Sequence, residues 1–293
     1  MFIELNLLYF ISCIIFCLLI GSFLNMLIYR LPLMIFKEWQ TECDHYLKEQ
    51  KKTKKKPDTN VSLLKPSRSF CPKCNHTIAK KDNIPLISFI LLKGKCRNCR
   101  KKIPLRYPLV ELLTLIVGLS VFIRFDFDLL GLAVLFLSFI LILIAFIDYE
   151  HMIIPDYLSY VGLWLGLLIN ISNYQIISID LAIYGAICGY LLLWSIYWIF
   201  KLTTGKEGFG HGDFKLSALF GAWLGIFNIF PVLIIASITG TIVFMINHSL
   251  TESKSHINKP FAFGPYLAIA GWLVLLFPEY LDINHLFFLN LFA

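Results

Sequence analysis

The run Leu129-Leu-Gly-Leu-Ala-Val-Leu-Phe-Leu-Ser-Phe-Ile-Leu-Ile-Leu-Ile-Ala-Phe-Ile147 gives the clearest indication of fold class in this sequence. The run contains no charged side chain, and Asp148 follows it directly. An uninterrupted apolar run of about 20 residues can cross a bilayer as a helix, whereas a strand of a membrane barrel would alternate apolar and polar residues. The run therefore predicts a transmembrane helix that ends at a carboxylic acid.

The composition of the whole chain also indicates a membrane protein. Of its 293 residues, 58% are hydrophobic and 15% are charged, and the mean hydropathy is +0.72. Soluble globular domains have about 25% charged residues and about 45–50% apolar residues. These values exclude an ordinary soluble domain.

Seven further apolar runs bring the expected number of transmembrane helices to eight. The first, Leu5–Tyr29, has no basic residue before it, and we interpret it as a retained anchor and not a cleaved signal peptide. The others cover residues 109–123, 157–171, 181–200, 214–229, 232–247 and 261–277. Pro231 and Pro265 mark the last two boundaries. We therefore expect an all-α polytopic membrane protein, a bundle of about eight transmembrane helices.

The basic residues are concentrated in one segment. Of the 26 Lys and Arg residues, 20 lie between Arg30 and Arg106. Because loops rich in Lys and Arg stay in the cytoplasm, we expect this segment there and the N-terminus outside. Eight spans then place residues 148–156, 201–213 and 249–259 on the cytoplasmic side as well. The expected parts are a first transmembrane helix (1–29), a basic cytoplasmic loop (30–107) and a transmembrane bundle (108–293).

The first half of the basic loop, Glu38–Asn60, is rich in lysine and poor in bulky apolar residues. This composition predicts a solvated, mobile segment that is attracted to anionic headgroups, so membrane lipid is an expected partner. No aromatic residues interleave with the lysines and no known module pattern is present, which argues against a nucleic-acid partner. Nothing in the sequence indicates an oligomeric state.

The second half of the loop contains two Cys-x-x-Cys motifs, Cys71-Pro-Lys-Cys74 and Cys96-Arg-Asn-Cys99, separated by 21 residues. Four thiolates at this spacing can hold a structural zinc ion in a tetrahedron, and the reducing cytoplasm argues against disulfides. A redox dithiol is the alternative, although it needs only one such motif. The fold is therefore expected to include a small zinc-binding cytoplasmic loop domain, in which Zn²⁺ supplies the folding energy that a small polar loop lacks.

Two aspartates are expected at the same depth on the cytoplasmic side. Asp148 ends one apolar run, and Asp213 begins another within Gly208-Phe-Gly-His-Gly-Asp213-Phe-Lys215. Acids at the edge of the hydrocarbon are costly and mark functional sites. Two carboxyl groups that lie close together share a proton, so one can activate water while the other protonates a scissile carbonyl or a leaving amine.

Simpler explanations of these acids also exist. Asp148 could end a helix among the headgroups, and Asp213 could be a helix N-cap. Asp156, after Pro155, is best explained as a cap, and Glu111 lies in the first turn of a helix, where acids are favoured. From the residues alone, an aspartic protease and a proton-coupled transporter are both open.

A series of motifs extends in a fixed order from Gly21 to about Gly271. The motifs are Gly21-Ser-Phe-Leu-Asn-Met-Leu-Ile-Tyr-Arg-Leu-Pro32, the two Cys-x-x-Cys pairs, Asp82-Asn-Ile-Pro85, Arg106-Tyr-Pro-Leu-Val-Glu111, Ile147-Asp148, Pro155-Asp156, Gly210-His-Gly-Asp213 and Phe263-Gly-Pro265. In this order they resemble the type IV prepilin (leader) peptidase/N-methyltransferase family. The Lys-rich segment between Phe36 and Pro66 is longer here than in many relatives.

The resemblance implies a bifunctional enzyme of the bacterial cytoplasmic (inner) membrane, connected with type IV pili or type II secretion. Such enzymes cut the basic leader from prepilins and pseudopilins by an aspartyl mechanism at the cytoplasmic face. They then methylate the new N-terminal residue with S-adenosylmethionine. By resemblance, the residues carried over are Asp148 and Asp213 for catalysis, Cys71, Cys74, Cys96 and Cys99 for zinc, and Gly94 and Lys95 for S-adenosylmethionine.

Three other interpretations are kept beside this one. A peptidase without methyltransferase activity would leave a free amine on its product. A proton-coupled transporter would use Asp148 and Asp213 along a water path, and a non-enzymatic scaffold would tolerate the loss of both acids.

Overall fold

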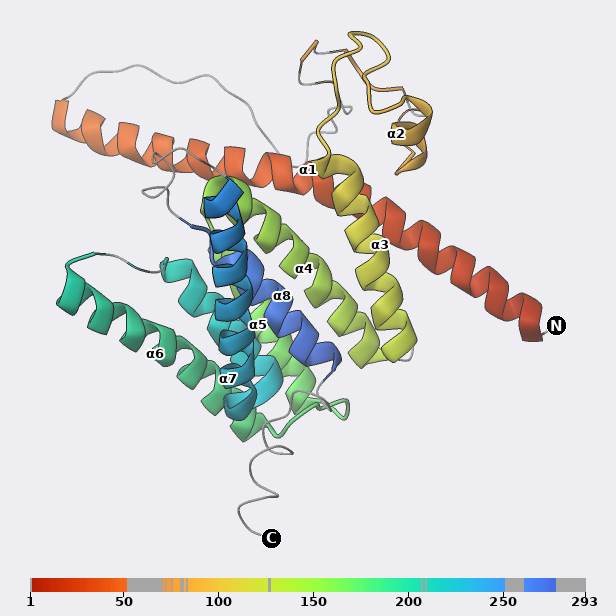
Figure 1. The fold of residues 1–293 in the computed structure, drawn as a ribbon. Coiled ribbons are helices and arrows are strands. Elements are labelled where there is room, and N and C mark those ends of the chain that lie inside the picture. Colours follow the sequence, from red (N-terminus) through yellow and green to blue (C-terminus); the bar gives the residue numbers. More distant parts are fainter. Residues whose placement is uncertain are drawn as a thin grey trace. The chain divides into compact units, whose positions relative to one another are not determined.

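The computed structural model of the chain is helical in both of its compact units, residues 1–119 and 120–293 (Figure 1). It describes residues 2–51, 71, 73–74, 76–79, 82, 84–125, 128–206, 208, 210–250 and 261–277. Over these residues the helices are α1 (Phe2–Lys51), α2 (Ile87–Leu91), α3 (Arg106–Arg124), α4 (Leu129–His151), α5 (Asp156–Ile171), α6 (Ile179–Thr204), α7 (His211–Leu250) and α8 (Gly264–Leu276). The described part contains no strand, and Lys95 and Lys102 form an isolated antiparallel bridge.

Five of the described helices, α1, α3, α4, α6 and α7, are long and apolar enough to cross a membrane. The apolar helices α5 and α8 are shorter, with 16 and 13 residues. Each apolar run that the sequence identified falls on one of these helices, with two runs on α7. The predicted all-α, multi-pass membrane architecture is therefore confirmed.

Helix α1 extends much further than its apolar run predicts. It continues through Pro32 to Lys51, so the residues after Glu38 are helical and not part of a mobile loop. The reason is local, because residues 33–51 contain no glycine or proline and include several strong helix formers. The rest of the Lys-rich segment, residues 52–60, lies outside the described residues.

In the N-terminal unit, α1 and α3 cross at Gly21. A Cβ atom at Gly21 would lie 2.9 Å from Cα of Glu111, so only glycine permits this approach. One turn later, Nδ2 of Asn25 donates a hydrogen bond to the carbonyl of Tyr107 over 2.9 Å. These two contacts explain why glycine and asparagine occupy these positions in the first motif.

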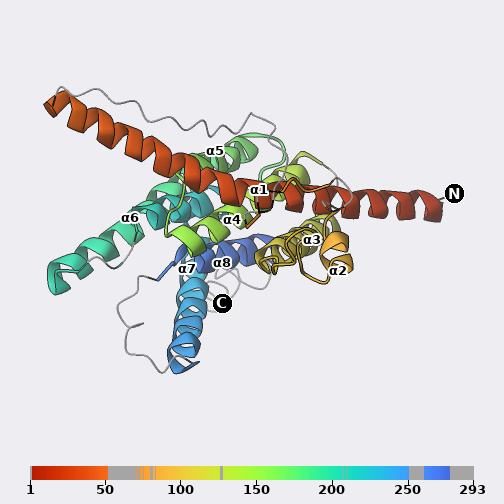
Figure 2. The same ribbon diagram turned by 90° about the horizontal axis from the view of Figure 1, so that it is seen from above.

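In the C-terminal unit, the first part of α7 is the core. Phe214, Leu219, Phe220 and Trp223 are all fully buried, and α7 packs against α5, α6 and α8. Helix α8 contacts both α4 and α7 (Figure 2). The indole N–H of Trp223 donates to the carbonyl of Gly162 in α5 over 2.8 Å, so a polar atom in this apolar core is satisfied.

Gly225 interrupts α7 and divides it into two helical segments. Its dihedrals, φ 79° and ψ 177°, lie outside the helical range and suit glycine. Nδ2 of Asn228 donates to the carbonyl of Leu224 over 3.1 Å, which compensates for a backbone bond lost at the break. The predicted boundary at Pro231 was therefore wrong, since Pro231 lies inside the second segment.

Candidate active site and metal site

The structure brings together Asp148 and Asp213, the two acids that sequence analysis singled out. Asp148 lies in the last turn of α4, and Asp213 lies in the first turn of α7. Each side chain is only 6% exposed, and Asp148 is near enough to act electrostatically on Asp213. A pair of buried acids at the ends of two helices can share a proton.

One backbone N–H holds each of these carboxyl groups. The N–H of Gly264, at the start of α8, donates to Oδ2 of Asp148 over 3.0 Å. The N–H of Gly210 donates to Oδ2 of Asp213 over 3.0 Å, so Asp213 also reaches back to cap its own helix. Asp213 therefore caps its helix and also lies close to Asp148, so the capping explanation and the catalytic explanation of this residue do not exclude each other.

Small residues and one isoleucine pack the chain closely around the acids. A Cβ atom at Gly264 would lie 2.6 Å from Oδ2 of Asp148. The side chain of Ile154 packs against both Gly264 and Gly212, where a Cβ would lie 3.0 Å and 2.7 Å from its atoms. The glycines of the Gly210-His-Gly-Asp213 and Phe263-Gly-Pro265 motifs thus allow three chain segments to meet at the two carboxyl groups.

Asp156 has a different environment from the two buried acids. Its carboxylate accepts a hydrogen bond from Nζ of Lys215 over 2.6 Å, and its side chain is 56% exposed. Lys215 also lies over the ring of Tyr160, 5.6 Å from its centroid. Pro155 and not Asp156 occupies the N-cap position of α5, and Asp156 lies in the first turn, where it forms an ion pair with Lys215 of α7 in place of the predicted cap.

The geometry of the acid pair suits acid–base work on water. Each carboxyl group receives one N–H donor from the described residues, which fixes one oxygen and leaves acceptor capacity on the group. A shared proton gives the pair one acid and one base at the same time. The arrangement can therefore activate a water molecule and protonate a nearby carbonyl or amine.

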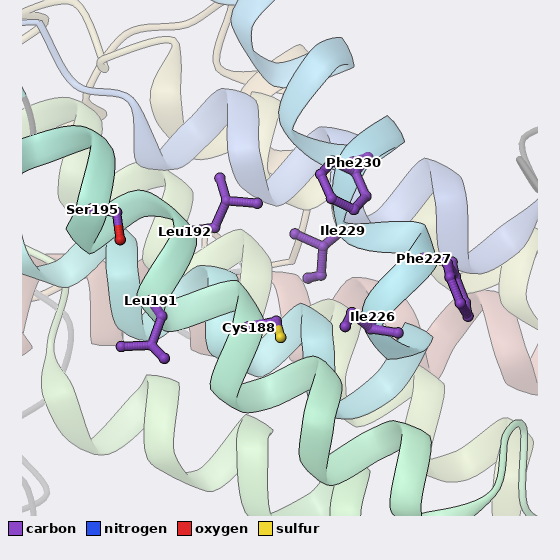
Figure 3. A pocket seen from close by; sticks show the side chains of 8 residues that line it. All are labelled: Cys188, Leu191, Leu192, Ser195, Ile226, Phe227, Ile229 and Phe230. Carbon is purple, nitrogen blue, oxygen red and sulfur yellow. The ribbon is translucent and has the colours of Figure 1, made fainter. Parts of the chain in front are cut away.

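A separate hollow of about 370 Å³ in the C-terminal unit lies between α6 and α7 (Figure 3). It is lined by Cys188, Leu191, Leu192, Ser195, Ile226, Phe227, Ile229 and Phe230. Leu191, Phe227 and Phe230 are exposed, as expected of a helix face toward lipid. None of the lining residues is an acid or a base, so this hollow does not provide the chemistry of the aspartate pair.

The four predicted zinc ligands converge in the N-terminal unit. The Sγ atoms of Cys71, Cys74, Cys96 and Cys99 all lie within 4.8 Å of one another. Cys71 and Cys99 are 3.9 Å apart at Sγ, and a tetrahedral zinc with Zn–S bonds of about 2.3 Å separates its sulfur ligands by about 3.8 Å. The described cluster therefore fits a zinc ion.

The two Cys-x-x-Cys motifs form similar backbone turns. The N–H of Cys71 donates to the carbonyl of His76, and the N–H of Cys96 donates to the carbonyl of Lys101, both over 2.9 Å. A hydrogen bond from the backbone of His76 lowers the pKa of the Cys74 thiol to about 7. Thiolate stabilised in this way is the form that binds metal.

An ion pair ties the second turn to the Asp82-Asn-Ile-Pro85 motif. Arg97 donates to both carboxylate oxygens of Asp82, from Nε over 2.7 Å and from Nη2 over 2.6 Å. This contact raises the pKa of Arg97. The bidentate geometry fixes the orientation of both side chains.

A cavity of about 440 Å³ adjoins the cysteine cluster within the N-terminal unit. Its lining includes Asn25 of α1, Cys71 and Cys96, Phe89 of α2, and Glu111 of α3. Glu111 is 9% exposed, and its Oε2 accepts a hydrogen bond from the N–H of Leu86 over 2.8 Å. Sequence reasoning explained Glu111 as a helix-end acid and did not single out Asn25, although both belong to the quoted motifs.

Gly94 and Lys95 lie in the turn before Cys96, outside the lining of this cavity. Gly94 has a positive φ of 67°, and a Cβ there would lie 3.1 Å from Cζ of Phe89. Gly94 therefore packs close to the ring of Phe89, a residue that lines the cavity. The assignment of these two residues to S-adenosylmethionine stays a prediction.

Comparison with known proteins gives matches over most of the chain. Residues 15–125 match the bacterial peptidase A24 N-terminal domain, which includes the four cysteines, and residues 135–245 match the type IV leader peptidase family, which includes Asp148 and Asp213. No solved structure matches.

Similar proteins include the prepilin leader peptidase/N-methyltransferase of Aeromonas hydrophila, 46% identical over 93% of this chain and 92% of the relative. The protein of the same name from Stutzerimonas stutzeri is 41% identical over 99% and 98%. That of Pseudomonas aeruginosa is 42% identical over 95% and 94%. With this identity over nearly the full length of its relatives, the chain belongs to the type IV leader peptidase family.

Proposed function

We propose that the protein is a bifunctional enzyme of the bacterial cytoplasmic membrane. It removes the leader from type IV prepilins and pseudopilins, using Asp148 and Asp213, and then methylates the new N-terminal residue with S-adenosylmethionine. The names of its relatives support both activities. The observation that carries the peptidase proposal is the buried pairing of Asp148 and Asp213, each anchored by a backbone N–H.

In the proposed cleavage, the two aspartates act as one unit. The ionised member takes a proton from water, and the water oxygen attacks the scissile carbonyl. The protonated member donates a hydrogen bond to the carbonyl oxygen and then gives its proton to the leaving amine. Because two interacting carboxyl groups titrate as a unit, the roles belong to the pair and not to either residue.

The proposed location of cleavage is the cytoplasmic face. The basic segment 30–106 supports this, since Lys and Arg concentrate on that side, and an even number of spans returns the chain there at Asp148. A prepilin would keep its apolar helix in the bilayer beside the bundle and present the leader junction to the aspartates. The basic leader is not expected to be attracted to the Lys-rich segment of the enzyme, because both carry positive charge.

The N-terminal unit is proposed to serve the methyl transfer. Cys71, Cys74, Cys96 and Cys99 would hold a structural Zn²⁺, which fixes the two turns beside the cavity. S-adenosylmethionine supplies an electrophilic methyl group on sulfur when bound. Gly94 and Lys95 are proposed to take part in its binding, with Gly94 supporting the Phe89 wall of the cavity.

Mass spectrometry of a prepilin incubated with the detergent-purified protein, with and without S-adenosylmethionine, tests the proposed function. Loss of the leader, together with one added methyl group only when S-adenosylmethionine is present, is the expected result. Cleavage without methylation would support the proposed peptidase activity and contradict the proposed methyltransferase activity. An intact prepilin after incubation with folded, zinc-loaded protein would contradict the proposal.

A further inference from the structure

Two buried side chains with unused acceptor atoms line the cavity in the N-terminal unit. Asn25 on α1 is 3% exposed and Glu111 on α3 is 9% exposed, and both line the cavity. The two helices are in contact here, because Gly21, one turn before Asn25, packs on the backbone at Glu111. Buried acceptors that line a cavity indicate what kind of group would bind there.

The orientation of Asn25 is fixed by a hydrogen bond. Its Nδ2 donates to the carbonyl of Tyr107 over 2.9 Å, an arrangement that a flipped amide could not make. Its Oδ1 is buried and has no hydrogen-bond partner among the described residues. A buried acceptor without a donor is costly, so a donor from a ligand would stabilise this site.

Glu111 adds a second acceptor and a negative charge. Its Oε2 accepts one hydrogen bond, from the N–H of Leu86, whereas a carboxylate has about four acceptor positions. Arg97, a cation of the cavity lining, is already held by both oxygens of Asp82. A buried carboxylate is stable only when a cation or several donors approach it.

We propose that Asn25 and Glu111 bind a primary α-ammonium group. Such a group is compact, carries one positive charge and has N–H donors for both Oδ1 of Asn25 and the carboxylate of Glu111. A guanidinium or an adenine would present a planar group and a different donor pattern. The size of the cavity, about 440 Å³, is in the range of small-molecule sites.

This inference rests on the proposed methyltransferase function, because both partners of that reaction carry a primary α-amine. One is the amino-acid part of S-adenosylmethionine, and the other is the new N-terminus of the cleaved pilin. The cavity lining also includes Arg30, Lys73, Lys101 and Lys102, which would suit a carboxylate next to the amine. The group that would bind at Asn25 and Glu111 is the same for both sources, and the experiment separates them.

Two pairs of ligands test the proposal on the full-length, zinc-loaded protein in detergent. The first pair is S-adenosylhomocysteine and its analogue without the α-amino group. The second pair is a peptide beginning with phenylalanine, with a free or an acetylated N-terminus. Affinities are measured by titration calorimetry for wild type, Glu111→Gln and the control Glu42→Gln, an exposed acid on α1.

In at least one pair, the ligand with the free amine is expected to bind wild type about tenfold more tightly, or better, than the ligand without it. A charge-assisted hydrogen bond predicts a difference of this size. Glu111→Gln keeps an acceptor for the N–H of Leu86 and should remove this preference, whereas Glu42→Gln should keep it. A loss confined to the first pair identifies the amine of the methyl donor. A loss confined to the second identifies the amine of the pilin.

The proposal is overturned if neither pair shows a preference in wild type, or if Glu111→Gln keeps the wild-type preference. Zinc content and a thermal unfolding midpoint of Glu111→Gln that equal those of wild type provide the folding control. Wild-type protein that transfers no methyl group would contradict the proposed methyltransferase function, whereas the amine preference is measured without any transfer.

Discussion

The carboxyl group of Asp148 accepts a hydrogen bond from the N–H of Gly264, and a Cβ atom on Gly264 would lie 2.6 Å from Oδ2 of the same carboxyl group. One residue thus provides both the hydrogen bond and the space that the acid needs. The acid pair therefore depends on the packing of α8 against α4 and α7, and not only on the two aspartates.

Replacement of Gly264 by alanine should inactivate the peptidase although it removes no acid. The new methyl group would displace the carboxyl of Asp148, and a displacement of about 1 Å can reduce a rate by about 100-fold. The initial rate of leader cleavage measures the effect. Gly240→Ala is the control, since a Cβ there meets neighbours only at 3.5 Å or more. Wild-type cleavage by Gly264→Ala would contradict the proposed geometry.

Replacement of Gly94 by alanine should reduce methyl transfer and spare leader cleavage. The substitution strains a backbone with φ 67° and also pushes on the ring of Phe89. Gly205→Ala separates these effects, because Gly205 has φ 69° with nothing within 4 Å of its Cβ position. Single-turnover methylation of a cleaved pilin is the measurement. Equal loss in both variants would mean that the substitutions destabilise the protein in general and do not act through Phe89.

Removal of zinc should loosen the N-terminal unit. Without the metal no bond holds the four cysteine side chains together, and the loop has little apolar core to replace the metal. Limited proteolysis measures this effect. In protein treated with a chelator, and in the Cys71→Ser variant, the protease should cut between residues 71 and 105 much faster than in the zinc-loaded protein. Cys43→Ser is the control, because this exposed cysteine on α1 lies outside the cluster. Unchanged protease resistance after confirmed loss of zinc would show that the metal is not structural.

The ion pair between Arg97 and Asp82 should affect zinc retention modestly. Arg97 is 59% exposed, and exposed pairs contribute about 1 kcal/mol or less. Arg97→Lys keeps the charge but loses the bidentate geometry, so it should release zinc to a chelator nearly as fast as Arg97→Ala. Stopped-flow measurement with a chromogenic chelator compares the two variants. Full retention in Arg97→Lys would mean that charge alone holds the turn.

Much of the fold follows from the apolar runs, because a span must be apolar wherever it meets lipid. Helix ends are harder to predict, because an apolar run indicates where the chain meets lipid and not where the helix stops. Proline suggested a break at Pro231, yet the break lies at Gly225, where Asn228 compensates for the lost backbone bond. Helix α1 continues past Pro32, since helix propensity extends it after the apolar run ends.

The candidate sites were predictable to different degrees. Asp148 and Asp213 were recognisable because acids are rare at the ends of apolar runs, and the cysteines were recognisable by spacing. Their partners Gly264 and Gly210 depend on tertiary packing, which no local pattern encodes. Asn25 and Glu111 were missed for a similar reason. Each has an ordinary local role, and their shared cavity appears only when α1 and α3 cross.

The proposed mechanism depends most directly on one measurement, which is the rate of leader cleavage by Asp148→Asn and by Asp213→Asn. Each variant is purified as a folded and zinc-loaded protein. Asp180→Asn is the matched control, since Asp180 is an exposed acid in the first turn of α6. We expect both single variants to lose cleavage as fully as the double variant, because residues that act as a unit are not additive. Cleavage at the wild-type rate by either single variant would contradict catalysis by the pair.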